Sequence, residues 1–136
     1  MRKHQRRQRG QSLVELALLL PVLISLSLGA LDMGRLFYYD DEFQSALHEA
    51  ARYASRHPGV STSTLQTMIQ NEGNLPSGSV TSVSVAQQTG SQSGYMFEQV
   101  TGTYNFTFIT PWFQRVGSIA NPLSIRTYTA AEVAPE

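Results

Sequence analysis

An apolar run close to the N-terminus constrains this chain more than any other feature. Residues Leu13 to Leu31 read LVELALLLPVLISLSLGAL, and as a helix they would extend about 28 Å at 1.5 Å per residue. Because the hydrocarbon core of a bilayer is about 30 Å thick, we predict one membrane-spanning helix here. Five basic residues precede the run and Asp32 follows it. The positive-inside rule therefore places the N-terminus in the cytoplasm and the rest of the chain outside.

Two residues inside the run are unusual for a membrane span. Pro21 removes a backbone donor and favours a kink in the helix. Glu15 is ionisable, and a carboxylate costs up to ~3 kcal/mol at the centre of a membrane helix, so it usually indicates a function or a partner. Glu15 lies near the cytoplasmic end, where the cost is smaller. It is either a tolerated interfacial carboxylate or a residue with a specific partner.

The charges of the chain are distributed unevenly. The formal net charge is 0, but five of the ten basic residues precede Gly10 and all ten acidic residues follow it. A chain without its first ten residues would keep five basic and ten acidic residues, a net charge of −5. Such an acidic body would repel phosphates, so we expect no nucleic acid partner. The absence of cysteine excludes disulfides, thiolate metal sites and cysteine lipidation.

The segment that joins the basic leader to the apolar run carries a recognisable pattern. Residues 10–15 read Gly-Gln-Ser-Leu-Val-Glu, so a glycine ends the leader and a glutamate stands five residues further on. This resembles the type IV prepilin processing site. The resemblance implies that a membrane aspartic peptidase cuts after Gly10, that Gln11 becomes the new N-terminus, and that Glu15 is the fifth mature residue. In low dielectric, a neighbouring subunit's new α-amino group would attract Glu15 strongly.

The longer stretch from Arg9 to Ala54 resembles the TadE-like family, the minor pilins or pseudopilins of the tight-adherence (Tad/Flp) pilus system. That resemblance implies a membrane-anchored subunit acting in pilus assembly and surface attachment. The implied partners are the prepilin peptidase, other pilin-like subunits, the Tad secretion machinery and membrane lipid, with no cofactor. Two positions differ from related pilins. Gln11 stands where many type IVa pilins have phenylalanine, and Leu16 stands where Flp pilins usually have an aromatic residue.

Helical periodicity continues beyond the span. Apolar residues recur at steps of three, four and seven, and place Leu36, Phe43, Leu47, Ala50 and Ala54 on one face. No helix breaker occurs before Pro58-Gly59, so we expect one helix from about Leu13 to His57. Ser61 or Ser63 is a suitable cap for a short second helix that carries Leu65, Met68 and Ile69. A loop is expected over residues 71–78.

The second half of the chain changes to a period of two. Val83 and Val85 alternate with serines, a longer alternation covers residues 100–108, and a third strand-like run covers residues 123–133. Residues 87–94 form a polar connection between the first two runs. We therefore predict an α+β fold in which a long N-terminal helix packs on a small antiparallel β-meander. The expected division is a leader at 1–10, a transmembrane helix at 11–31, and an extracytoplasmic domain at 32–136.

The sequence offers no case for an enzyme. His48 and His57 are nine residues apart, which does not match the i,i+4 spacing of helical metal ligands, and no nucleophile-turn motif is present. The aromatic residues at 37–39 fit either an interfacial belt or a helix-packing surface. Trp112 and Phe113 are expected to serve as core or interface anchors. The sequence predicts no catalytic, metal or cofactor site.

Two other interpretations of the N-terminus remain open at this stage. The first is a secretory signal peptide, which also has a basic start and an apolar core; it would release a soluble chain starting near Leu31. The second is a permanently anchored accessory or binding protein that keeps residues 1–10 and never enters a filament.

Overall fold

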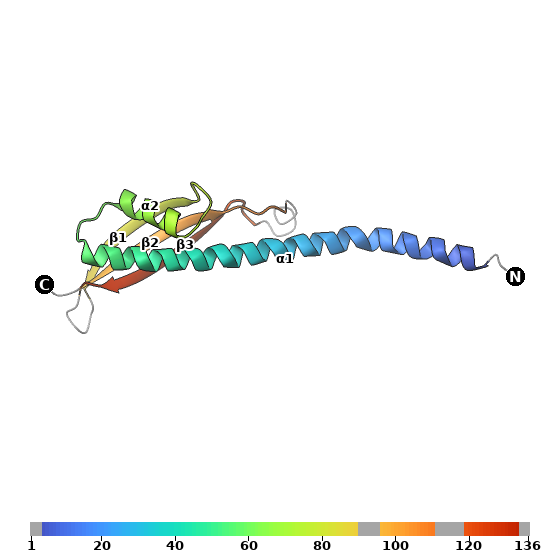
Figure 1. The fold of residues 1–136 in the computed structure, drawn as a ribbon, viewed down its shortest axis with the longest axis horizontal. Helices are drawn as coiled ribbons and strands as arrows, with labels where there is room; N and C mark the ends of the chain where they lie inside the picture. The colour runs from blue at the N-terminus through green and yellow to red at the C-terminus, as the bar shows by residue number, and fades with distance from the viewer. Residues whose placement is uncertain (1–3, 90–95, 111–118, 134–136) are drawn as a thin grey trace.

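One helix extends through much of the molecule, and the other elements pack against its second half (Figure 1). The structure is a computed structural model that describes residues 4–89, 96–110 and 119–133, with side chains at residues 10–88, 96–110 and 119–133. The elements are α1 (His4–Arg56), α2 (Thr62–Glu72), β1 (Val80–Thr89), β2 (Met96–Phe106) and β3 (Leu123–Glu132). The expected α+β arrangement, a long helix on an antiparallel meander, is confirmed.

Helix α1 ends as predicted but begins earlier. Its last residue is Arg56, immediately before the breaker at Pro58-Gly59, and Gly59 adopts a left-handed φ of 84°. Its first residue is His4 rather than Leu13. The predicted start was wrong because it followed the apolar pattern alone. The leader consists mostly of arginine and glutamine, which favour helix without any apolar periodicity.

The three strands form one sheet in the order β1-β2-β3, and both pairs are antiparallel. In β2, burial alternates residue by residue, as a strand with one covered face requires. Val100 on the covered face pairs with Val85 of β1 and with Thr129 of β3. Strand β1 includes Thr89, so the first part of the predicted polar loop at 87–94 belongs to the strand. Its remainder lies outside the described residues.

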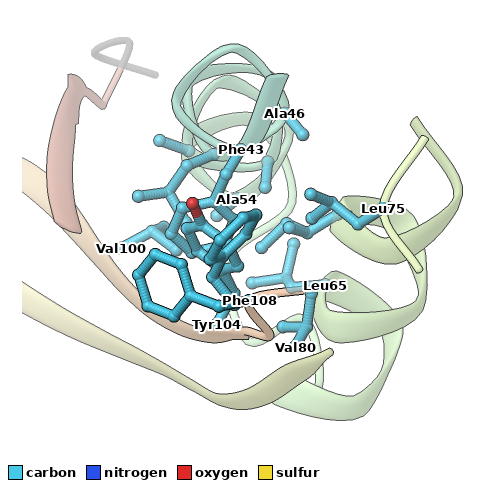
Figure 2. Packing of buried hydrophobic residues seen from close by; sticks show 14 residues of the cluster. Phe43, Ala46, Ala54, Leu65, Leu75, Val80, Val100, Tyr104 and Phe108 are labelled. Atoms are coloured by element: carbon cyan, nitrogen blue, oxygen red, sulfur yellow. The ribbon is translucent and has the colours of Figure 1, made fainter. Parts of the chain in front are cut away.

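The core lies between the covered face of the sheet and the two helices. Helix α1 contributes the predicted face, with Phe43, Leu47, Ala50 and Ala54 all fully buried and Leu36 packed at its edge. In Figure 2, Phe43 and Ala54 of α1 meet the side chains of the other elements. These are Leu65 of α2, Val100 and Tyr104 of β2, and Phe108, which follows β2.

Gly102 allows α1 and β2 to approach closely. A Cβ built on Gly102 would lie 2.7 Å from Cζ of Phe43 and 2.8 Å from Cδ1 of Leu47. These separations are too short for real carbon atoms, so the phenylalanine and leucine occupy the space that any side chain at position 102 would need. Glycine therefore sets the depth at which α1 packs into the sheet.

Helix α2 begins with the predicted serine cap and covers the start of β1. The Ser61 hydroxyl accepts from the Thr64 N–H at 3.2 Å, which satisfies one unpaired donor of the first turn. Gln70 then links the helix to the edge strand, because its Oε1 accepts from the Val80 N–H at 3.3 Å and its Nε2 donates to the Pro76 carbonyl at 2.7 Å. The helix continues through Glu72, so the loop predicted at 71–78 begins two residues later than expected, at Gly73.

Candidate assembly segment and its junction with the domain

From Leu13 to Leu31, α1 is apolar and stands clear of the domain (Figure 1). Its side chains are exposed on all sides, from Leu13 at 67% and Leu18 at 71% to Leu31 at 65%. The most apolar 18-residue window has a mean hydropathy of 2.2, and only 6% of it is buried. A helix that is apolar all round requires an apolar environment. Since the domain does not provide one, this helix is compatible with a single-pass membrane anchor by length and composition.

The two serines inside the apolar segment are satisfied by its own backbone. The Ser25 hydroxyl donates to the Pro21 carbonyl at 2.7 Å, and the Ser27 hydroxyl donates to the Leu23 carbonyl at 2.9 Å. Serine commonly bonds the carbonyl four residues earlier in this way. The two hydroxyls therefore need no partner outside the helix, and α1 remains continuous through Pro21.

The predicted processing residues lie on the exposed start of this segment. Gly10 is exposed, and a Cβ added to it would meet nothing within 4 Å. Gln11 and Glu15 are one helical turn apart, and the Gln11 amide donates to Oε1 of Glu15 at 3.3 Å. Gly10 lies within α1 rather than in an extended leader. A protease that binds extended chain would have to unwind this turn, and glycine costs a helix about 1 kcal/mol relative to alanine, which makes unwinding easiest here.

Glu15 has no charged partner among the side chains that the structure describes. Its recorded contact is the amide of Gln11, and the two ion pairs found in that part of the chain are Asp32–Arg35 and Glu49–Arg52. The carboxylate therefore remains accessible to a cation from another molecule.

Asp32, at the end of the apolar segment, ties α1 to the chain that follows β2. It is 1% exposed. Its carboxylate accepts from the Ile109 N–H at 3.1 Å, from the Thr110 N–H at 2.8 Å and from the Thr110 hydroxyl. Arg35 completes the set, with its Nη1 3.2 Å from Oδ1 of Asp32. The buried carboxylate thus has donors on both oxygens, as a buried charge requires.

The environment of Asp32 also determines its protonation. Burial alone would raise the pKa of this carboxyl. The hydroxyl and N–H of Thr110, the N–H of Ile109 and the Arg35 side chain all favour the charged form, and together they lower the pKa of Asp32 below its ordinary value of 3.8. Asp32 is therefore a carboxylate at neutral pH.

Arg35 links this junction to the aromatic part of the core. Its guanidinium carbon lies 5.8 Å from the ring centroid of Tyr39 and 5.4 Å from that of Phe106, within the range of a cation–π interaction. From the sequence alone, Asp32 is expected only to close the span. An Asp-x-x-Arg spacing at the end of the apolar run was the single available signal, because Thr110 lies 78 residues further along the chain.

The aromatic residues at 37–39 differ in exposure, and only Tyr39 takes the predicted packing role. Phe37 is 70% exposed and Tyr38 is 51% exposed. Tyr39 instead packs against the core, with its ring centroid 6.3 Å from that of Phe106. Trp112 and Phe113, expected as anchors, lie outside the described residues.

The two histidines of α1 serve separate local contacts. His48 Nδ1 lies 2.6 Å from the Thr129 hydroxyl of β3, and His57 stacks on the Tyr53 ring at 4.1 Å. Within residues 10–88, 96–110 and 119–133, no group of three or more His, Asp or Glu side chains is placed to hold a metal ion.

These features define a protein with an exposed apolar helix that continues into the core of a small α+β domain. Residues 10–52 match the model of the TadE-like protein family. The resemblance predicted from the sequence is therefore confirmed over this segment, which includes Gly10, Gln11, Glu15 and Asp32. The TadE-like family is a structural, non-enzymatic family associated with Tad pili. No curated protein and no solved structure matches the chain.

Proposed function

We propose that this protein is a minor pilin or pseudopilin of a Tad/Flp-type pilus, acting in pilus assembly and surface attachment. One observation carries the proposal: a single helix is lipid-compatible and exposed in its first half and forms the domain core in its second half. An apolar helix of that kind needs lipid before assembly. In a filament, the matching helices of other pilin-like subunits replace the lipid.

The proposed life cycle follows from the order of the segments. The chain inserts with its basic N-terminus in the cytoplasm and residues 32–136 outside, as a single-pass protein of the cytoplasmic membrane. Prepilin peptidase removes residues 1–10, residues 11–31 remain as the transmembrane helix, and the Tad machinery moves the subunit into the pilus. The five basic residues before the span support this orientation.

Glu15 is proposed as the residue that joins one subunit to the next. Its carboxylate is exposed and lacks a charged partner among the described side chains. After cleavage, the α-amino group of Gln11 in a neighbouring subunit would supply the opposite charge. In a low dielectric such a pair is strong, and it would offset the cost of placing Glu15 in an apolar environment.

Substitution of Glu15 by alanine tests this role in the native host. We expect the variant to insert and accumulate in the membrane normally but to give few or no pili. Glu72→Ala is the matched control, because Glu72 is an exposed carboxylate on α2, far along the chain from the apolar segment. Normal piliation in the Glu15 variant would contradict the assembly role, and the permanently anchored accessory protein would then become the better account.

A further inference from the structure

An exposed isoleucine lies beside the turn of α1 where the apolar segment ends. The N–H groups of Ile109 and Thr110 donate to the Asp32 carboxylate at 3.1 and 2.8 Å, so the backbone here is fixed against α1. The side chains on either side are buried, Phe108 at 7% and Thr110 at 4% exposure, whereas Ile109 is 68% exposed. The buried side chains of Phe108 and Thr110 and the bonds to Asp32 therefore fix the outward position of Ile109.

Asp32 places this isoleucine at a definite depth. If residues 13–31 cross the bilayer, Asp32 lies at the outer boundary of the hydrocarbon. The headgroup layer adds about 5–7 Å on each side of the hydrocarbon core. The Ile109 nitrogen is 3.1 Å from the Asp32 carboxylate, so Ile109 lies within or directly at that layer. An apolar side chain that is exposed at this depth faces lipid rather than bulk water.

Exposed apolar and aromatic side chains of α1 itself lie on either side of this depth. Leu31, adjacent to Asp32 and about 100° around the helix from it, is 65% exposed. Phe37 and Tyr38 follow within two turns and are 70% and 51% exposed. On the side toward the sheet, α1 carries the charged Asp32 instead of an apolar residue. Ile109 supplies the exposed apolar side chain on that side, so the apolar surface of the span continues onto the domain.

We propose that Ile109, held by Asp32, is a second membrane contact through which the domain rests on the outer leaflet of the phospholipid bilayer. The inference rests on the proposed membrane span and goes beyond it. A helix alone leaves the domain free to rotate and tilt about the α1 axis. A second contact fixes which face of the domain is turned toward the bilayer before the subunit is incorporated.

Single-cysteine labelling tests the contact, because the chain contains no cysteine. Full-length Ile109→Cys would be labelled with an environment-sensitive fluorophore and placed, one copy per disc, in phospholipid nanodiscs containing lipids with a quencher near the headgroup. One copy per disc excludes a neighbouring subunit as the cause of any protection. We expect a blue-shifted emission and strong quenching by the lipid-borne quencher.

Two further variants separate failure of the contact from failure of the span. Leu31→Cys, 65% exposed in the apolar segment, reports on the span. Tyr128→Cys is the control for a label in water, because Tyr128 is 70% exposed and lies far from the proposed membrane boundary. Its neighbour Thr129 contacts His48, and His48 is sixteen residues beyond Asp32, about 24 Å further along α1. If the label at 109 behaves like that at 128 while the label at 31 is quenched, the second contact is wrong and the span stands. If the label at 31 is also unquenched, the span and the function built on it are both wrong.

Discussion

Replacement of Asp32 by asparagine tests the junction between the apolar segment and the domain. The change preserves the size of the side chain but removes its charge and one of its two acceptor oxygens. The remaining amide oxygen accepts at most two of the four hydrogen bonds that Asp32 now receives from Arg35, Ile109 and Thr110. The other donors would face an NH₂ group.

The expected loss of stability follows from those hydrogen bonds. Leaving a buried donor such as the Thr110 N–H unpaired costs about 1–3 kcal/mol, and each surviving bond weakens when its acceptor loses the charge. We expect a total of about 2–4 kcal/mol. At roughly 4–8 °C per kcal/mol for a domain of this size, the unfolding midpoint should fall by roughly 8–30 °C.

Thermal unfolding of the full chain in detergent, followed by near-ultraviolet circular dichroism, measures this loss. Asp41→Asn is the matched control, because it removes the same charge from an exposed position of α1 and should change stability by less than about 0.5 kcal/mol. Amide hydrogen exchange at Ile109 and Thr110 gives a local readout and should accelerate in the Asp32 variant alone. Equal unfolding midpoints for the two variants, with both amides still protected, would refute the proposed junction.

Three further predictions concern single residues of α1 and β2. Gly102→Ala should lower the unfolding free energy by about 1–3 kcal/mol, because the new methyl group would overlap Phe43 and Leu47. Gly34→Ala should raise it by about 0.5–1 kcal/mol, because a methyl group on this exposed helical residue meets nothing within 4 Å; the opposite order in chemical denaturation would contradict the packing described. Burial raises the pKa of Tyr104 to about 12 and the nearby Asp40 carboxylate adds to the shift, so the folded state binds this proton more tightly than the unfolded state, whose pKa is about 10. Stability should therefore fall as pH rises from about 10 to about 12, and a Tyr104→Phe variant should lose most of that dependence in pH-resolved unfolding experiments.

The elements that the sequence predicted well are those with a strong local pattern. The core face of α1 was predictable because apolar residues such as Phe43 and Leu47 repeat at helical spacing until Pro58 ends the helix. The strands were predictable because their side chains alternate, although β1 begins at Val80 and β2 at Met96, before the alternation becomes evident. Local pattern was sufficient wherever one face of an element is covered and the other is not.

The features that the sequence did not predict depend on contacts between distant residues. The bond from Thr110 to Asp32 joins residues 78 positions apart, and no local rule pairs them. The fit of Gly102 against Phe43 likewise requires the packed structure. The early start of α1 at His4 was missed for a different reason, since the leader is helical by intrinsic preference and has no apolar pattern to reveal it.

The most direct test of the central claim is the N-terminal mass of the mature protein, measured with and without the prepilin peptidase of its own host. The account predicts a chain that begins at Gln11 only when the peptidase is present. A chain that keeps Met1 both with and without the peptidase would contradict the pilin class and support a permanently anchored accessory protein. A chain that begins near Leu31 in both cases would show that the apolar helix is a signal peptide.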